Sequence, residues 1–218
     1  NVLVISDYDQ IELRIAAEIA DDKAMKQAFI DGDDLHTKTA QAITGKEEVT
    51  KDERNHGKAV NFGFLYGAGP ARFKQTAKSQ YGIDMTEEEA DSYRERWRDQ
   101  YPGIRSWQIR QGNSKQTRSV LGRLGKPTTY NQPLMYPIQG TGVEGLKKAM
   151  ILLNKSKVRT KLGAKLIMAI HDELILEVKE DHAEVAKAAL ERCMIEGMSE
   201  FIKEVPITVS SRISKTYG

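Results

Sequence analysis

The segment IMAIHDELILEV, residues 167–178, places one imidazole and two adjacent carboxylates between two apolar runs. Apolar runs joined by two or three polar residues are typical of a β-hairpin, here predicted at about 165–178 with His171, Asp172 and Glu173 at its tip. Neighbouring carboxylates repel, which raises their pKa values unless a cation lies beside them. Because Mg²⁺ binds one or two carboxylates together with substrate phosphates, the tip is a candidate metal site; the alternative is a solvent-exposed acidic turn.

A further carboxylate, Asp7, follows an apolar strand predicted at residues 2–5. Apolar strands of one small sheet lie side by side, so Asp7 and Asp172 are candidates to meet at one edge of it. Two carboxylates that converge from distant parts of a chain suit a two-metal site, which clamps the attacking and leaving oxygens of a phosphoryl displacement. Spacing alone leaves the convergence open.

A third candidate is a helix predicted at about 51–67, KDERNHGKAVNFGFLYG. Arg54, Lys58, Phe62 and Tyr66 recur every four residues, and each such step turns only about 40° around a helix. The side chains therefore form one slowly turning stripe of two cations and two aromatic rings. Cations hold a triphosphate and aromatic rings stack on a base. The alternative is a helix with its aromatic rings in a core and its cations in water.

The remaining pattern mixes helices with short strands. Thr86 followed by Glu89 is a capping box, which predicts a helix start, and YPG at 101–103 ends that helix. Elsewhere the pattern predicts a helix after Asp7, polar helices over 21–57 with a break at DGDD, strands and loops over 117–138, helices over 140–163 and 181–204, and a strand over 205–211.

Composition indicates a globular chain of 218 residues, with 39% hydrophobic and 29% charged residues. No apolar run approaches the roughly 20 residues that span a membrane, and the start lacks the basic segment of a signal peptide. Cys193 is the single cysteine, which excludes an internal disulfide and favours an intracellular setting, in the cytoplasm or nucleoid, with an organelle or a viral host cytoplasm left open. The chain begins without Met, so a fragment or a processed product is expected.

Positive charge is concentrated between residues 94 and 126. Nine Lys or Arg residues and two acidic residues give this window a net charge of +7, while the whole chain carries +2. Trp97, Tyr101 and Trp107 lie among the cations, a combination that suits a phosphate backbone. A solvated helix face is the alternative.

Together these motifs resemble those of DNA polymerase family A. DYDQIELR, from Asp7, resembles its motif A; RNHGKAVNFGFLYG, from Arg54, its motif B; and HDE, from His171, its motif C. DLHTKTA and PIQGTGVEGLKKAM also match segments of that family, in the family's order. The resemblance covers nearly the whole chain.

The resemblance implies an α/β fold of the α+β kind. Residues 1–24 and 128–218 are expected to form a palm, a small and mostly antiparallel sheet backed by helices. Residues 25–127 are expected to form an inserted, all-helical fingers subdomain. The implied reaction is template-directed nucleotidyl transfer with two Mg²⁺ ions, in which the 3′-oxygen of a DNA primer attacks the α-phosphate of a dNTP and pyrophosphate leaves.

The resemblance also assigns roles. Asp7, Asp172 and the backbone carbonyl of Tyr8 match metal ligands, and Glu173 matches a residue near the metals. The residues that match nucleotide contacts are Arg54, Lys58 and His36 at the triphosphate, with Lys58 also the proton donor to pyrophosphate, Phe62 and Tyr66 beside the sugar and base, Glu12 as the steric gate against a ribose 2′-OH, and Gln10 near the nascent pair. The residues that match primer or template contacts are His171, Gln139 and Arg123.

Some features depart from the family pattern. Asp9 stands where the family usually has Ser, and Asn131 and Met135 stand where Arg and Asn are expected, which puts template and primer contacts there in doubt. In the family a thumb precedes motif A, so we expect a longer polymerase or a separate chain to supply the thumb. The sequence does not decide whether the 218 residues are active alone.

Two alternatives remain open. A single-subunit RNA polymerase shares the aspartates and a Lys-to-Tyr helix, but a carboxylate at Glu12 rejects ribose. The second alternative is a non-catalytic nucleic-acid-binding module. The presence of intact Asp7, Asp172, Lys58 and Arg54 argues against it.

Overall fold

A computed structural model describes residues 1–217, and the chain forms two compact units. Unit 1 consists of Asn1–Glu12 together with the residues from Gln139 onward, and unit 2 consists of Leu13–Ile138. The fold is α+β, as predicted, with helices and small antiparallel sheets.

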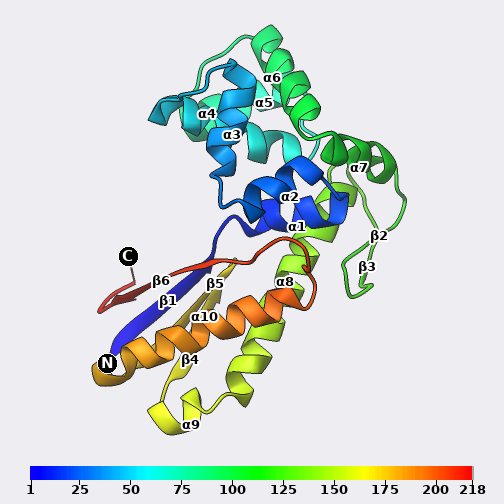
Figure 1. Cartoon of the computed structure of the whole chain (residues 1–218). Coiled ribbons are helices and arrows are strands. Elements are labelled where there is room, and N and C mark those ends of the chain that lie inside the picture. The colour runs from blue at the N-terminus through cyan, green and yellow to red at the C-terminus, as the bar shows by residue number, and fades with distance from the viewer. Residues whose placement is uncertain (218) are drawn as a thin grey trace. The chain divides into compact units, whose positions relative to one another are not determined.

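Unit 1 is built on a four-stranded antiparallel sheet with the order β4-β5-β1-β6 (Figure 1). Its strands are β1 (Val2–Tyr8), β4 (Lys165–Ile170), β5 (Glu173–Val178) and β6 (Val209–Ser214). The predicted hairpin is confirmed as β4 and β5. The last strand begins at Val209 rather than at Val205, so the prediction of a strand over 205–211 was only partly right.

One helix lies along this sheet and a second packs against that helix. α10 (Ala183–Ser199), preceded by the short 3-10 helix η1 (Glu180–His182), runs beside β1 and β6 (Figure 1). The Tyr8 hydroxyl donates to the carbonyl of Met194 in α10 at 2.7 Å. α8 (Gln132–Lys155), which α9 (Val158–Leu162) follows, approaches α10 so closely that a Cβ on Gly197 would lie 2.6 Å from the backbone nitrogen of Ala149. Only glycine fits there.

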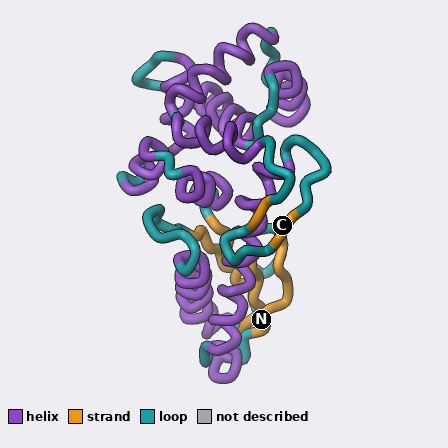
Figure 2. Tube along the Cα trace, turned by 90° about the vertical axis from the view of Figure 1, so that its right-hand side faces the viewer, coloured by secondary structure: helices purple, strands orange, loops and turns teal. Residues whose placement is uncertain are grey.

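Unit 2 is mostly helical (Figure 2). Its elements are most of α1 (Ile11–Ala20), then α2 (Lys23–Ile30), α3 (Leu35–Thr44), α4 (Lys51–Leu65), α5 (Pro70–Tyr81), α6 (Glu87–Gln100), α7 (Pro102–Gly112) and the first turns of α8. The expectation of an all-helical segment over 25–127 was wrong in one respect. Two short strands, β2 (Thr117–Arg118) and β3 (Leu124–Gly125), pair antiparallel there.

Capping side chains set where two of these helices begin. The predicted capping box is confirmed: the backbone N–H of Glu89 donates to Thr86 Oγ1 at 3.1 Å, and that of Thr86 donates to the Glu89 carboxylate at 2.7 Å. Thr50 and Glu53 form a second, unpredicted capping box at the start of α4. Each box satisfies backbone donors that the first turn of a helix leaves unpaired.

The core of unit 2 is aromatic. The rings of Phe64 and Phe73 lie 4.3 Å apart between centroids, and Trp97 packs on Phe64 and on Tyr101. Trp97, Tyr101 and Trp107 are 0%, 1% and 5% exposed. The interpretation of these rings as nucleic-acid contacts among the cations of residues 94–126 was therefore wrong, because they are core residues.

The compact units divide at residues 12/13 and 138/139, whereas the palm and fingers were predicted to divide at 24/25 and 127/128. Contacts within unit 2 explain where α1 and α2 belong. Arg14 of α1 stacks on the Phe29 ring of α2 at 4.5 Å, and the buried Asp22 carboxylate accepts from the backbone N–H groups of Gly103 and Ile104 at the start of α7. The names palm and fingers stay a prediction.

The prediction of strands and loops over 117–138 was right for β2, β3 and the loops around them, but wrong from Gln132 onward, where α8 begins. α8 also contains Pro137. Proline lacks the N–H that a helix needs at its interior positions. Pro137 leaves the carbonyl of Pro133 without its helical donor, and Thr117 Oγ1 donates to that carbonyl at 3.3 Å instead. A tertiary hydrogen bond thus offsets a local helix-breaking signal. Among the described residues, no helix is long and apolar enough to cross a bilayer.

Candidate functional site

Asp7 and Asp172 lie together at one end of the four-stranded sheet. β1 and β5 pair antiparallel with Asp7 opposite Glu173, and the backbone N–H of Tyr8 donates to the carbonyl of Asp172 at 3.4 Å. The predicted convergence at one sheet edge is therefore confirmed. His171 begins the turn with a φ of 53°, a left-handed conformation that is uncommon for a residue other than glycine.

Strand alternation determines which groups face the acidic end. Successive side chains of a strand point to opposite faces of the sheet. Tyr8 lies on the face toward α10, where its ring is buried and its hydroxyl is bonded to Met194. Asp7 and the paired Glu173 share the opposite face. The Tyr8 side chain therefore points away from the acidic groups, and the assignment of its backbone carbonyl as a metal ligand stays a prediction.

The acidic cluster has little compensating charge. Burial, with the neighbouring carboxylates of Asp172, Glu173 and Asp9, raises the pKa of Asp7 to about 6. Asp7 Oδ1 and Glu173 Oε1 are buried and have no hydrogen-bond partner among residues 1–217. Arg212 approaches Glu173 only to 3.9 Å. Buried anionic oxygens are costly unless they are paired or bind a metal.

The donor set suits a hard cation only in part. Among the described residues, no group of three or more His, Cys, Asp and Glu side chains is arranged to hold a metal ion. What the chain provides is a carboxylate pair, Asp7 and Asp172, with an unpartnered buried oxygen on Asp7. Mg²⁺ is commonly held by one or two carboxylates, with substrate phosphates and water completing its octahedron. The residues present therefore fit a site that is completed by substrate.

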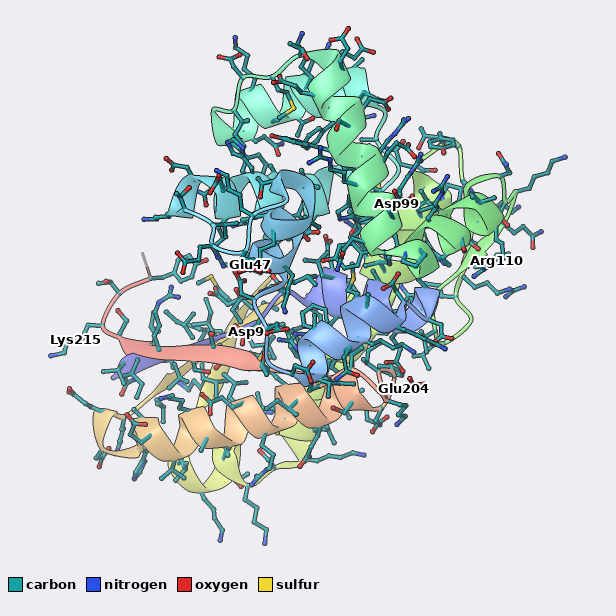
Figure 3. All side chains as sticks on the ribbon, turned by 45° about the horizontal axis from the view of Figure 1, so that its top comes forward. Asp9, Glu47, Asp99, Arg110, Glu204 and Lys215 are labelled. Atoms are coloured by element: carbon teal, nitrogen blue, oxygen red, sulfur yellow. The ribbon has the colours of Figure 1, made fainter. Side chains whose placement is uncertain are left out.

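Asp9, directly after β1, adds to the negative charge (Figure 3). The hydroxyl of Ser210 in β6 donates to Asp9 Oδ1 at 2.6 Å. This contact fixes the carboxylate that stands where the family usually has Ser. Its charge is one of the causes of the raised pKa of Asp7.

Two predicted nucleotide-site residues of unit 1 are joined by a hydrogen bond. Gln139 Nε2, in α8, donates to Glu12 Oε1 at the start of α1 at 3.1 Å. Gln10, in the turn between β1 and α1, has a φ of 51°, and its Oε1 is buried without a partner among the described residues. Sequence spacing gave no signal of the bond between Glu12 and Gln139, which are far apart in the chain.

In unit 2, α4 carries the predicted stripe. Arg54 Nε and Nη2 donate to the two oxygens of Asp34 at 2.6 and 3.0 Å, a bidentate ion pair. Although partial burial opposes it, the bonds from Arg54 and Thr37 lower the pKa of Asp34 to about 2. Lys58 is exposed and Phe62 is half-buried. Tyr66 stands just beyond the last helical residue, Leu65.

His36 lies on α3, which packs closely on α4. A Cβ on Gly57 would lie 2.2 Å from the carbonyl oxygen of His36, so the close approach requires glycine. The His36 ring is 5.9 Å from the Phe62 ring and the residue is 4% exposed. Burial lowers the pKa of His36 to about 4; Asp34 opposes this shift, whereas Arg54 and Lys58 favour it. His36 is therefore neutral at physiological pH.

Three of the nine cations of residues 94–126 are in ion pairs with other described residues. Arg94 contacts Asp91 at 2.7 Å, Arg98 contacts Glu95 at 3.0 Å, and Arg105 contacts Asp99 at 3.4 Å. Arg96 and the paired Arg105 are exposed as well, and Arg96 donates to the carbonyl of Ile43. Farther along the chain, the exposed cations that form no ion pair within the described part of the chain are Arg110, Lys115, Arg118, Arg123 and Lys126 (Figure 3 for Arg110). Arg123 follows the turn that connects β2 to β3, and its side chain is exposed.

The predicted site residues thus form two sets. Unit 1 contains Asp7, Tyr8, Gln10, Glu12, Gln139, His171, Asp172 and Glu173, and unit 2 contains His36, Arg54, Lys58, Phe62, Tyr66 and Arg123. Sequence reasoning missed Asp34, which holds Arg54, and it missed the bond that joins two predicted residues, Gln139 and Glu12.

The sequence model of DNA polymerase family A matches residues 1–218. The chain belongs to DNA polymerase family A. Relatives in this family include DNA polymerase I of Aquifex aeolicus, 38% identical over 225 residues that cover 100% of this chain and 39% of the relative. The thermostable DNA polymerase I of Thermus filiformis is 34% identical over 235 residues, covering 99% of this chain and 27% of the relative.

A solved family A structure has the same fold. The POL domain of Pol1 from M. smegmatis, in complex with DNA primer-template and dNTP, superposes with a TM-score of 0.87 at 26% identity. The match covers 99% of this chain and 40% of that one. The chain thus spans well under half the length of these relatives, and the resemblance seen in its motifs is confirmed.

Proposed function

We propose that the protein that carries this chain is a template-directed DNA polymerase that adds dNTPs to the 3′ end of a primer. The observation that carries the proposal is the convergence of Asp7 and Asp172 at the end of paired strands, in a chain of DNA polymerase family A. The named relatives and the complex of the M. smegmatis domain with primer-template and dNTP support the same substrates.

In this proposal Asp7, Asp172 and the Tyr8 carbonyl hold two Mg²⁺ ions, with Glu173 close by. The unpartnered oxygens of Asp7 and Glu173 support the assignment, because a cation satisfies them. When bound, the metals favour the deprotonated primer 3′-hydroxyl and stabilise the charge that develops on the phosphoryl oxygens. The carboxylates position these charges, and no side chain forms a covalent intermediate.

The cations of unit 2 are assigned to the triphosphate. Arg54 is held rigidly by Asp34, which reduces the conformational entropy that it loses on binding a phosphate. Lys58 is exposed on the same stripe and carries an ammonium proton that it can transfer to the pyrophosphate leaving group. His36 adds a neutral donor.

Phe62 and Tyr66 are assigned to the sugar and base of the nucleotide, since aromatic faces accept any base. Glu12 is the proposed gate against a 2′-hydroxyl, and its bond to Gln139 fixes its carboxylate. Gln10 and Gln139 are assigned to the nascent pair, His171 to the primer end and the exposed Arg123 to the template or primer backbone. Template pairing then supplies the sequence, and these contacts supply position.

The test is primer extension by the full polypeptide that carries this chain. We expect extension that requires Mg²⁺ and uses dNTPs. The order in which nucleotides are added should change when the template sequence is changed. A chelator should stop extension and added Mg²⁺ should restore it. A folded protein that fails to extend any primer, or adds nucleotides without regard to the template, would refute the proposal.

A further inference from the structure

A buried hydrogen-bond network in unit 2 joins α3, α4 and α6 through the side chain of Asn61. Asn61, Thr39 and Trp97 are 0% exposed, and Tyr101 is 1% exposed. Asn61 Oδ1 accepts from Thr39 Oγ1 at 2.8 Å and from Trp97 Nε1 at 2.9 Å. Its Nδ2 lies 3.1 Å from His36 Nδ1 and 3.5 Å from the carbonyl of Leu35. Both ends of the amide are therefore used.

The neighbours of Asn61 determine which way its amide faces. An indole N–H can only donate, so the amide atom toward Trp97 must be the oxygen. The amide nitrogen therefore faces His36 and donates to Nδ1. A neutral imidazole that accepts at Nδ1 carries its proton on Nε2. The network thus selects one of the two tautomers of His36.

The same network opposes protonation of the ring. In the imidazolium form, an N–H at Nδ1 would face the amide N–H of Asn61, two donors without an acceptor. Burial also lowers the pKa of His36, which agrees with this geometry. Among the described residues, no hydrogen bond to Nε2 is formed, so its N–H is available to a ligand. The charged groups near the ring are Asp34, Arg54 and Lys58.

We propose that Asn61 is a positioning residue that fixes His36 in the Nε2–H tautomer, so that the ring donates a hydrogen bond to a phosphate oxygen of the nucleotide. This inference rests on the proposed function, in which His36, Arg54 and Lys58 contact the triphosphate. Trp97 and Thr39 act indirectly, because their hydrogen bonds to Asn61 Oδ1 fix the orientation of the Asn61 amide. The wrong tautomer would direct a lone pair at an anionic oxygen, so the network determines whether His36 attracts or repels the ligand.

The direct test is ¹⁵N NMR of histidine-labelled full polypeptide, with His36→Gln to assign the His36 signals. In the parent we expect a neutral ring protonated at Nε2. In Asn61→Asp a carboxylate faces the ring, so we expect Nδ1 to be protonated and the pKa of His36 to rise. Trp97→Phe keeps the packing of a ring but removes the indole donor, so both tautomers should be populated. A parent ring protonated at Nδ1 overturns the inference.

The kinetic test uses the KM for dNTP across pH. In Asn61→Asp the imidazolium still donates through Nε2 at low pH, but above its raised pKa the Nε2 lone pair faces the phosphate. Loss of one hydrogen bond to a charged group corresponds to roughly a tenfold change in affinity, so KM relative to the parent should rise about tenfold at alkaline pH and return toward the parent value near pH 6. A merely structural defect would change KM equally at all pH values.

Asn113→Asp is the matched control, because Asn113 is exposed in the same unit and the change adds the same charge. Its KM profile should follow that of the parent. An Asn61→Asp enzyme with the parent's tautomer and a flat KM ratio overturns the inference. If Asn61→Asp does not fold, the Trp97→Phe variant decides. A His36 ring that stays wholly in the Nε2–H tautomer in that variant overturns the inference. NMR reports the tautomer of His36 without any reaction taking place. Failure of the parent to extend primers therefore refutes the proposed function and leaves the tautomer to be judged by NMR alone.

Discussion

The two units hold their charged site residues in opposite ways. In unit 2, Asp34 holds Arg54 with two hydrogen bonds and Asn61 bonds to His36. In unit 1, Asp7, Asp172 and Glu173 are crowded together, and buried oxygens of Asp7 and Glu173 lack partners among the described residues. Two of the three groups proposed to contact the triphosphate, Arg54 and His36, are thus held by other protein groups.

The contrast shows what fixes the geometry of the charged side chains in each unit. A partnered cation keeps its geometry without ligand, so unit 2 contributes a preorganised surface. Crowded carboxylates destabilise the fold unless a cation lies beside them, so under the proposed function unit 1 gains its order when a cation binds. Opposite pKa shifts of two aspartates express the same difference: the pKa of Asp7 is raised to about 6 and that of Asp34 is lowered to about 2.

The largest effect outside the carboxylates is expected at Lys58. General acid catalysis typically contributes about 10²–10⁴-fold, so Lys58→Ala should lower the single-turnover extension rate by that range. Lys58→Arg keeps the charge, but its guanidinium does not release a proton, and it should remain strongly impaired. Lys51→Ala, at an exposed position of the same helix, is the control. Near-parent rates in Lys58→Arg would show that charge alone is needed.

A smaller effect is expected from Glu12→Ala, which removes the side chain proposed to exclude a 2′-hydroxyl. The ratio of dNTP to NTP incorporation efficiency should fall by about tenfold or more, because each ~1.4 kcal/mol of lost discrimination is tenfold. Glu12→Gln keeps the bulk and should keep most of the ratio. An unchanged ratio in Glu12→Ala would remove the main physical argument for a DNA rather than an RNA polymerase.

Stability should change in opposite directions in the two units. The pKa of Asp7 is above its unfolded value, so its ionisation destabilises the fold as pH rises from about 4 through 6. Asp34 has a lowered pKa, so its contribution is full above pH ~4 and is lost toward pH 2. After discounting for solvent exposure, we expect Asp7→Asn to stabilise and Asp34→Asn to destabilise the protein by about 1 kcal/mol each at pH 7.

Urea unfolding of the metal-free full polypeptide at pH 7 and pH 5 measures this difference. The stabilisation by Asp7→Asn should shrink at pH 5, where Asp7 is largely protonated in the parent. Changes of the same sign at both positions would contradict the contrast between the units.

The smallest effect is expected in DNA binding. Exposed cations that meet phosphates release counterions, so Arg110→Ala should reduce the slope of log K against log salt by about 1. Arg98 is paired with Glu95, and Arg98→Ala should change the slope less. Equal changes in slope for the two substitutions would mean that cations in ion pairs on α6 contact DNA phosphates as readily as unpaired cations do.

The hairpin and the convergence of Asp7 with Asp172 were predictable from sequence, because apolar runs fix strands and polar residues mark their ends. The stripe on α4 followed from the period of a helix. Trp97 was misread, although Ala90, Trp97 and Tyr101 are spaced by seven and then four residues, the pattern of one buried helix face. That pattern was a stronger signal than the cations around it.

The partners of the site residues were not predictable. The bonds of Asn61 to His36 and of Gln139 to Glu12 depend on how distant helices pack, and neither residue type marks its partner in the sequence. The start of α8 was missed for the same reason. Pro137 predicts a break locally, and only the tertiary bond from Thr117 to the Pro133 carbonyl compensates for it.

The central claim is that Asp7 and Asp172 form the metal-binding centre of nucleotidyl transfer. The most direct test is the single-turnover rate of primer extension in Mg²⁺ by Asp172→Asn, with Asp181→Asn as the control because Asp181 is an exposed carboxylate on η1. A lost metal ligand removes several kcal/mol of transition-state stabilisation, so we expect Asp172→Asn to be slower by at least about 10³-fold while its unfolding midpoint stays close to that of the parent. The extension rate of Asp181→Asn should stay within about twofold of the parent rate, because an exposed charge away from the reacting centre contributes little. A folded Asp172→Asn protein that extends primers within about tenfold of the parent would contradict the claim.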